Sequence, residues 1–325
     1  MAHSPRPSTI LPVASTSRRP APPVRGRFQP AMRPNTTAVF LLVCPDARGI
    51  VASVTGFISK HGGNIVDSDF HIDATANLFL GRVEWSLADF SVASRDDILR
   101  QVELLCAPYG GQWSLHFSDK VQRIAIWCSK QDHCVLDLLN RLRNDDLGRA
   151  EVVLVLSNHE DLRERVEAYG IPFRTVKTDP TKCKAEEKSR VEAEQLRILK
   201  EEEVDIVVLA KYMQILSDDF VQKFGEGNIV NIHHSFLPAF VGAKPYHQAH
   251  KRGVKIIGAT AHFVTAELDA GPIIEQDVVR ISHRENVADL VRKGKDLERV
   301  VLARAVRLCV ERRVLKYGNK TVVFE

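Results

Sequence analysis

Long apolar runs are missing from this sequence. Its longest apolar stretches, such as AVFLLVC and EVVLVLS, have the length of a strand, whereas a membrane helix needs roughly 18 uninterrupted apolar residues. Closely spaced cysteine pairs are missing too, because none of the six cysteines falls in a C-x-x-C pair. We therefore predict a soluble protein of a reducing compartment whose cysteines are mostly core residues: Cys44, Cys106, Cys128 and Cys309.

Acidic residues are absent from positions 1–35, which hold six arginines and many serines, threonines and prolines. This composition is typical of an organelle transit peptide, and we predict a mitochondrial address, with the plastid as an open alternative. A disordered leader on a cytoplasmic protein is the other interpretation, because the prolines disfavour an amphipathic helix. Of 45 Lys and Arg residues, 39 lie beyond the leader beside 41 Asp and Glu, so no nucleic-acid partner is indicated.

A chain of 325 residues with 44% hydrophobic residues can form about two domains after this leader. Residues 36–118 alternate as strand, helix, strand, strand, helix, strand, which is the ferredoxin-like order. The strands are expected at 38–44, 64–73, 78–87 and 112–118, and the helices at 50–62 and 94–110. Strand 38–44 or 112–118 is expected at an edge of the sheet, where a second subunit would cover it.

The segment CPDARGIVASVTGFISKHGGNI resembles the ACT family, whose small domains pair into shared sheets and often bind an amino acid. The resemblance implies a homo-oligomer and an effector such as glycine or methionine. Asp46, Arg48 and Gly49 precede the first helix, where backbone amides suit an effector carboxylate. A dimerisation module that binds nothing is the alternative.

Residues 119–325 have repeated strand–helix units, which predicts an α/β domain with a Rossmann-like, mostly parallel sheet. Its strands are expected at 123–128, 151–158, 173–176, 205–210, 227–235 and 255–264. The charged helix near 181–202 mixes acidic and basic residues and is interpreted as a solvated face. A long helix over roughly 286–314 is expected to close the domain.

Polar residues directly after apolar strands are candidates for chemistry, because open parallel sheets bind ligands at the carboxyl ends of their strands. In NIVNIHHSFLPAF, Asn231 and His233 share strand parity, whereas His234 is expected on the other face. In GATAHFVTAELDAGPIIEQ, Asp269 lies in a loop between two strands. An amide and an imidazole can stabilise an oxyanion, and a carboxylate can manage the proton of an attacking water.

These two stretches together resemble the signature of folate-dependent formyltransferases and formylhydrolases over residues 119–325. With the ACT-like segment, LPAFVGAKPYHQAHKRGVKIIGATAHF resembles the formyltetrahydrofolate deformylases. The resemblance implies hydrolysis of 10-formyltetrahydrofolate to formate and tetrahydrofolate, in one-carbon metabolism and formate supply for purine synthesis. It assigns carbonyl polarisation to Asn231, oxyanion stabilisation to His233, and water positioning with proton transfer to Asp269.

The same resemblance implies that the folate lies between DIVVLAKYMQIL and HFVTAELD. The expected substrate-binding residues are Met213, Ile215, Leu216, His262, Val264 and Leu268. Without the resemblance, Met213 and Leu216 would be interpreted as core residues. No metal or redox cofactor is implied, since His234 and His262 lack a recognised metal-ligand spacing.

Two other functions remain open at this point. A phosphoribosylglycinamide formyltransferase would need a Gly-rich loop for the acceptor's phosphate, but the matching stretch is WCSKQDHCVLDLL, with only Ser129, Lys130 and Gln131 there. A catalytically silent, ACT-regulated folate binder is the second alternative, against which the combination of Asn231, His233 and Asp269 argues. Formylation of methionyl-tRNA would be expected to need a further domain and a basic surface.

Overall fold

The computed structural model describes residues 36–92, 94–178, 181, 183–239 and 244–325. The leader predicted at 1–35 lies outside the described residues. Within the described part, no helix is both long and apolar enough to cross a membrane. Cys44, Cys106, Cys128 and Cys309 are buried, as predicted.

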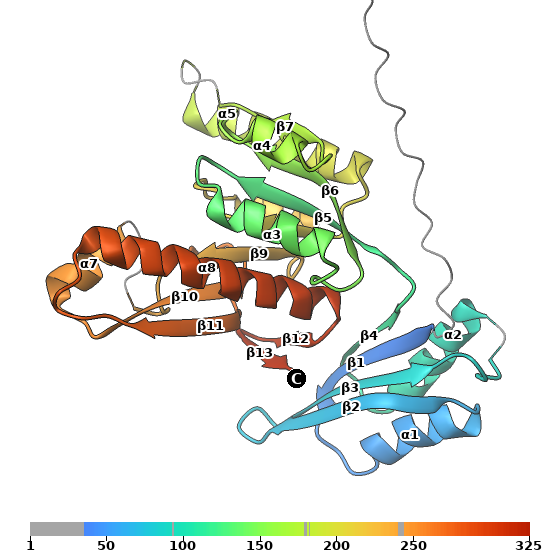
Figure 1. Cartoon of the computed structure of the whole chain (residues 1–325). Helices are drawn as coiled ribbons and strands as arrows, with labels where there is room; N and C mark the ends of the chain where they lie inside the picture. The colour runs from blue at the N-terminus through green and yellow to red at the C-terminus, as the bar shows by residue number, and fades with distance from the viewer. Residues whose placement is uncertain (1–35, 93, 179–180, 182, 240–243) are drawn as a thin grey trace, which may run out of the picture. The chain divides into compact units, whose positions relative to one another are not determined.

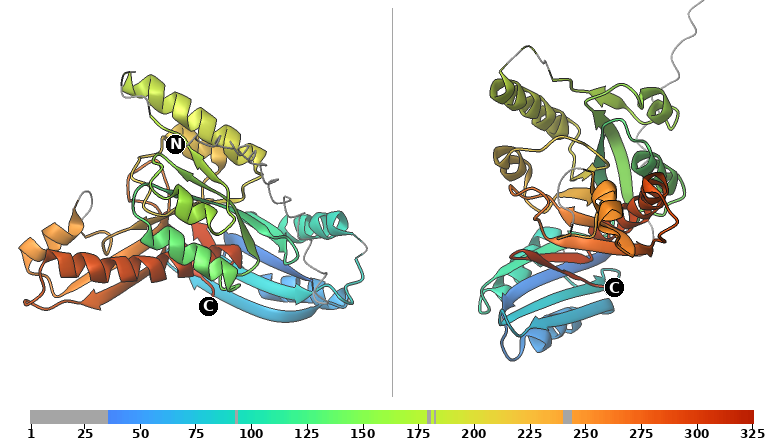
Figure 2. Two further views of the ribbon diagram at one scale, coloured as in Figure 1. Left: turned by 45° about the horizontal axis from the view of Figure 1, so that its top comes forward. Right: turned by 90° about the vertical axis from the view of Figure 1, so that its left-hand side faces the viewer.

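The amino-terminal region contains a four-stranded antiparallel sheet in the order β2-β3-β1-β4. Its elements follow the predicted order: β1 (Thr37–Pro45), α1 (Ile50–Lys60), β2 (Asn64–Asp73), β3 (Leu78–Ser86), α2 (Arg95–Cys106) and β4 (Gln112–Phe117). Apolar stripes of both helices, including Ile50 and Val54 of α1 and Ile98 and Val102 of α2, share one core with the sheet. The two helices therefore cover the same face, as the right-hand view of Figure 2 shows. This arrangement confirms the ferredoxin-like prediction.

One expectation for this sheet is wrong. Strand β1, which contains residues 38–44, pairs with both β3 and β4 and is an interior strand. It is apolar along nearly its whole length because its side chains from Ala38 to Leu42 are buried on both faces of the sheet. The edges are β2 and β4, so only the expectation for residues 112–118 is confirmed.

The second sheet has seven strands in the order β11-β10-β9-β8-β5-β6-β7 (Figure 1). They are β5 (Gln122–Cys128), β6 (Ala150–Ser157), β7 (Phe173–Thr175), β8 (Ile206–Leu209), β9 (Ile229–His233), β10 (Ile256–Phe263) and β11 (Ile273–Arg280). Strands β5 to β9 run parallel, whereas β10 and β11 join antiparallel to their neighbours. The mostly parallel α/β fold is thus confirmed.

Helices cover both faces of the larger sheet. One core contains buried residues of α3 (His133–Arg143) and α8 (Val287–Val310), with Val166 of the short α4 (Arg163–Glu167). The opposite core contains residues of α5 (Lys184–Glu201) and α6 (Asp218–Phe224). A further helix, α7 (Pro245–Arg252), packs beside α8.

The chain after α8 differs from the single long helix that we predicted. A capping box between Asn286 and Asp289 starts α8, but the helix ends at Val310 and Arg312 adopts φ +56°. A hairpin of β12 (Val314–Tyr317) and β13 (Lys320–Val323) follows. A residue in the left-handed region cannot continue a right-handed helix, so the apolar pattern after 310 belongs to a strand.

The charged helix also differs from its prediction. In α5 the side chains of Glu187, Glu192 and Gln195 are buried, so its polar residues are not confined to a solvated face. Glu192 accepts hydrogen bonds from the backbone N–H and the hydroxyl of Ser217, at 2.8 and 2.5 Å. Ser217 is the residue that caps α6, so a buried carboxylate of one helix fixes the start of the next.

Candidate active site

Asn231 and His262 lie opposite each other in the antiparallel pair of β9 and β10. Opposite residues on one face are neighbours, and here Asn231 Nδ2 lies 3.2 Å from His262 Nε2. His262 Nδ1 lies 2.9 Å from the carbonyl oxygen of Phe263, which can only accept, so Nδ1 carries the proton. Burial lowers the pKa of His262 and keeps its ring neutral, which leaves Nε2 to accept from Asn231.

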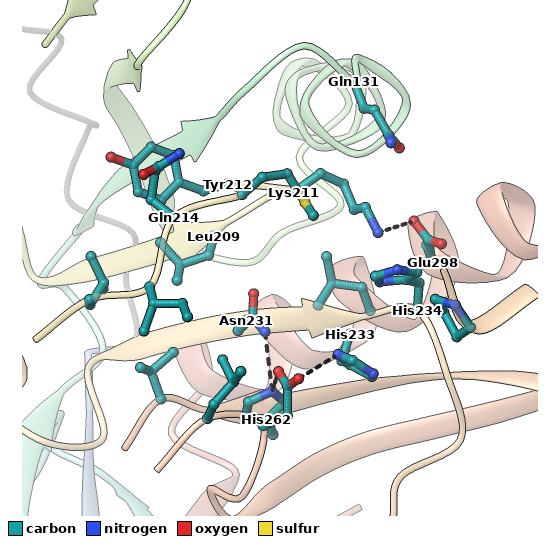
Figure 3. Close-up of a pocket in the computed structure, with 18 of the residues that line it drawn as sticks. Gln131, Leu209, Lys211, Tyr212, Gln214, Asn231, His233, His234, His262 and Glu298 are labelled. Carbon is teal, nitrogen blue, oxygen red and sulfur yellow. Dashed lines mark hydrogen bonds and ion pairs between the residues drawn. The ribbon is translucent and has the colours of Figure 1, made fainter. Parts of the chain in front are cut away.

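Asp269 reaches these residues from the loop between β10 and β11. Gly271 lets this loop pass close to β10, because a Cβ there would lie only 1.8 Å from the carbonyl oxygen of Phe263. Asp269 itself adopts φ +54°, and its Oδ2 lies 3.2 Å from His233 Nδ1. Its other oxygen, Oδ1, lies 3.8 Å from His262 Nε2. The three residues predicted to be catalytic therefore meet at one place (Figure 3).

The electrostatics favour an ionised Asp269. Burial alone raises the pKa of this carboxyl, but the hydrogen bond from His233 and the nearby imidazoles lower it below its usual value. His233 then donates through Nδ1 to the carboxylate. Its other nitrogen, Nε2, is buried and has no hydrogen-bond partner among the residues that the structure describes. Because His233 lines the pocket, this open nitrogen is available to a bound ligand.

A pocket of about 540 Å³ opens over these residues. All six predicted substrate-binding residues line it: Met213, Ile215, Leu216, His262, Val264 and Leu268. Met213, Ile215 and Leu268 are more than half exposed, so they form an apolar rim around a polar floor. Exposed apolar side chains gathered at a pocket are typical of a binding site for a ligand with a flat apolar part.

The expectation for His234 is wrong. Strand β9 ends at His233, so the alternation of side chains does not extend to the next residue. His234 lines the same pocket as His233, and the two ring centroids lie 5.1 Å apart. Burial and the charge of Lys211 lower the pKa of His234 to about 4, which makes its ring neutral near pH 7.

A buried charged cluster also borders the pocket, and the sequence did not reveal it. Glu298 of α8 lies 3.3 Å from Lys211 Nζ, and it accepts from Tyr246 OH at 2.6 Å and from His133 Nε2 at 2.8 Å. Gly294 makes room for this contact, because a Cβ there would lie 2.0 Å from Tyr246 OH. Burial raises the pKa of Glu298, but His133, Lys211 and Tyr246 together lower it to about 2.

Two signals in the sequence could have indicated this cluster. Lys211 lies two residues after the apolar strand β8, near the carboxyl end of a parallel strand where polar residues are candidates for a site. Glu298 occupies the apolar stripe of α8, between the buried residues Leu290 and Val301. A charged residue on the buried face of an amphipathic helix requires a partner, which points to an ion pair.

The stretch after β5 does not resemble a phosphate-binding loop. The hydroxyl of Ser129 donates to Asn158 Oδ1 at 2.8 Å and accepts from the backbone N–H of Met213 at 3.1 Å. Ser129 thus joins the ends of β5, β6 and β8. Among the described residues, the group suited to a metal ion is His133, Cys134 and Glu298, where the Lys211 ammonium already supplies the positive charge.

The residues proposed for an effector lie in the turn between β1 and α1. Asp46, Arg48 and Gly49 are all exposed there, and Gly49 precedes the helix with φ +91°. The backbone N–H of Asp46 already donates to the carbonyl oxygen of Asn77 at 3.0 Å. The amides nearer to the helix start are therefore the ones that could receive a carboxylate.

Comparisons with known proteins show which family the chain resembles. A family model described as formyl transferase matches residues 122–306. The chain is 55% identical to the formyltetrahydrofolate deformylase of Synechocystis sp. over 290 residues, which cover 89% of this chain and 99% of that protein.

Solved structures extend the likeness. A formyltetrahydrofolate deformylase from Pseudomonas syringae has a TM-score of 0.84 and 43% identity, covering 89% of this chain and 95% of that one. A glycinamide ribonucleotide transformylase from Symbiobacterium toebii has a TM-score of 0.59 and 29% identity. The match covers 95% of that transformylase but only 63% of this chain. The likeness to the deformylase therefore extends over more of the chain than the likeness to the transformylase.

Proposed function

The chain belongs to the formyltetrahydrofolate deformylase family, and we propose that Asn231, His233 and Asp269 catalyse its hydrolysis of 10-formyltetrahydrofolate to formate and tetrahydrofolate. The formate would supply one-carbon metabolism and purine synthesis. The observation that supports this assignment best is the contact of 3.2 Å between His233 Nδ1 and Asp269 Oδ2, directly beside the Asn231 amide. This contact places His233, which can donate a hydrogen bond to an oxyanion, beside Asp269, which can accept a proton, in one pocket.

The substrate would enter through the apolar rim of the pocket. Met213, Ile215 and Leu216 would pack against the flat pterin, and the loop from Val264 to Leu268 would bind its polar edge. His262 has a second role beside lining the pocket. By accepting a hydrogen bond from Asn231 Nδ2, it fixes the amide, whose remaining N–H can polarise the formyl oxygen.

Water attack on the formyl carbon would produce an anionic tetrahedral intermediate. Asp269, ionised near pH 7, would orient the water and accept its proton, while His233 would stabilise the oxyanion. The pair would then return the proton to the departing N10 nitrogen, so the carbon–nitrogen bond breaks with formate and tetrahydrofolate as products. No step in this scheme requires a metal ion or a redox cofactor.

Purified protein with 10-formyltetrahydrofolate tests this proposal. We expect one formate per tetrahydrofolate, both with and without glycinamide ribonucleotide. Turnover that depends on the ribonucleotide and releases no formate would instead support a phosphoribosylglycinamide formyltransferase. Tight folate binding without any turnover would support a catalytically silent binder.

The ACT-like sheet is also proposed to make the protein a homo-oligomer that responds to an amino acid. The edge strand β4 offers unpaired backbone groups to a second subunit, and the turn at Arg48 and Gly49 would bind the effector carboxylate. Light scattering should show a dimer or larger, and glycine or methionine should change the rate. A monomer that responds to neither amino acid would contradict the regulatory proposal and leave the hydrolysis unaffected.

The leader is proposed to direct the protein to mitochondria. This rests on the composition of residues 1–35, with six arginines and no acidic residue. Residues 1–35 fused to a fluorescent reporter should bring the reporter to mitochondria, and a chain starting at Asn35 should hydrolyse substrate like the full chain. A reporter found in plastids or in the cytosol would contradict the mitochondrial location.

A further inference from the structure

The pocket has an arm beyond the catalytic residues that the folate scheme does not use. This arm lies past His234 and is lined by Gln131, Lys211, Tyr246, Lys295 and Glu298. The Lys211 side chain spans the gap from the end of β8 to α8, where its Nζ lies 3.3 Å from Glu298 Oε2 (Figure 3). Both side chains are at least 96% buried, so the ion pair is a fixed wall and not a mobile surface contact.

The backbone at this position would suit a residue without a side chain. Lys211 adopts φ +64°, a conformation that glycine adopts freely and a lysine adopts only with strain. Strain at a residue of this kind persists where surrounding contacts outweigh it. Here those contacts are the pair with Glu298 and, through Glu298, the bonds to Tyr246 and His133. The lysine side chain is therefore held in place by the whole cluster.

Hydrolysis and formyl transfer differ only in the nucleophile. Water needs no space beyond the catalytic residues, whereas a primary amine needs a channel that holds its substituent while its nitrogen reaches the formyl carbon. The arm past His234 is the part of this pocket that the proposed folate contacts leave free, so it is the space such a substituent would occupy. Since Glu298 balances the charge of Lys211, the lysine excludes an amine chiefly by its volume.

We propose that Lys211, held by Glu298, is the specificity-determining residue that restricts the nucleophile to water. This inference rests on the proposed hydrolysis. Without the lysine side chain, the nitrogen of a primary amine would bond to the formyl carbon as the bond from that carbon to N10 breaks. The proton that the amine loses goes to N10, so the products are a formamide and tetrahydrofolate.

The test compares Lys211→Gly with Lys211→Met, using glycinamide as the amine at a pH where part of it is neutral. The glycine variant relieves the strained backbone and removes the side chain, whereas methionine retains most of the volume without the charge. Tetrahydrofolate, formate and N-formylglycinamide are all measured. In the wild type and in Lys211→Met, formate should equal tetrahydrofolate at every glycinamide concentration.

In Lys211→Gly, tetrahydrofolate should exceed formate, with N-formylglycinamide making up the difference and rising with amine concentration. The amine product should exceed the background measured with the wild type at least about tenfold, as expected when a pocket gains room for a small group. Circular dichroism confirms folding, and Lys211→Ala replaces the glycine variant if that variant is unstable.

Three results would overturn the inference. The first is formate equal to tetrahydrofolate in a folded Lys211→Gly at all amine concentrations. The second is as much amine product from Lys211→Met as from Lys211→Gly. The third is the loss of all folate turnover in the folded variants, which would place Lys211 in hydrolysis itself. The wild type alone separates the two claims, because no formate from the wild type contradicts the proposed function.

Discussion

Two carboxylates border the same pocket, and they differ in how many partners hold their oxygens. Around Glu298 both carboxylate oxygens have partners, supplied by Lys211, Tyr246 and His133. Asp269 has one close partner, His233 Nδ1 at 3.2 Å, and its other oxygen lies 3.8 Å from His262 Nε2. A carboxylate whose oxygens are all occupied fixes the shape of a site, whereas one with few partners can still bind a water or a ligand.

The two carboxylates also differ in backbone position and in exposure to solvent. Glu298 lies inside a long helix and is 1% exposed, whereas Asp269 is a loop residue with a positive φ. Both have lowered pKa values, but that of Glu298 falls further, to about 2. The pKa shift by itself therefore does not identify the catalytic carboxylate. The proposal for Asp269 rests instead on its few partners and on its place in the pocket beside Asn231 and His233.

The largest expected effect comes from Asp269→Asn. The amide keeps the shape of the side chain but cannot accept the water's proton, so turnover should fall about a hundredfold to a thousandfold while folate affinity changes little. Steady-state kinetics with a separate folate-binding measurement test this. Asp219→Asn, the same change at an exposed carboxylate that does not line the pocket, is the matched control. An Asn variant that keeps more than about a tenth of the activity would show that Asp269 does not carry the proton.

Glu298 should stabilise the folded protein by an amount that depends on pH. Its pKa is about 2 in the folded protein against 4.5 for the free group, so its contribution is complete above pH 4.5 and is lost as the pH falls toward 2. A shift of this size corresponds to about 3 kcal/mol in the free energy of unfolding.

Urea unfolding between pH 6 and pH 2 measures this contribution. Glu298→Gln should remove the part of the pH dependence that lies below pH 4.5, whereas Asp219→Asn, a change at an exposed carboxylate, should not. A Glu298→Gln variant that loses stability with acid as steeply as the wild type would show that the cluster is not held by charge.

His233 and His234 should differ although both line the pocket. His233→Ala removes the partner of Asp269 and should lower kcat about a hundredfold. His234 has a lowered pKa and is neutral near pH 7, so His234→Ala should lower kcat/KM about tenfold or less. Equal losses of kcat in two folded variants would contradict the division of roles.

The smallest expected effect concerns the titration of His234. Its pKa of about 4 results first from burial and second from the charge of Lys211. Lys211→Met removes only the second cause, so the pKa should rise by about one unit or less. NMR titration of the imidazole measures it. A pKa that stays near 4 in the variant would show that burial alone keeps the ring neutral.

Much of the fold could be predicted from the sequence because its patterns are local. Apolar strands separated by helical stretches indicated the parallel sheet, and the order of elements at 36–118 indicated the ferredoxin-like region. The prediction of the edge strand was wrong for β1, because an apolar strand is equally suited to the interior of a sheet. The end of α8 was missed because apolar residues in the β12–β13 hairpin continue the helical pattern.

The sequence by itself predicted which residues come together at the candidate site. Asn231 and His233 share strand parity, and Asp269 lies in the loop before β11, which is enough to predict that they meet. Only the tertiary structure decided the surroundings of that site. Lys211 and Glu298 lie 87 positions apart in the chain, and their ion pair exists because α8 packs on β9, β10 and β11, which brings Glu298 within reach of the residue after β8. Pairing between distant segments depends on the packing of whole elements, which no local pattern of residues records.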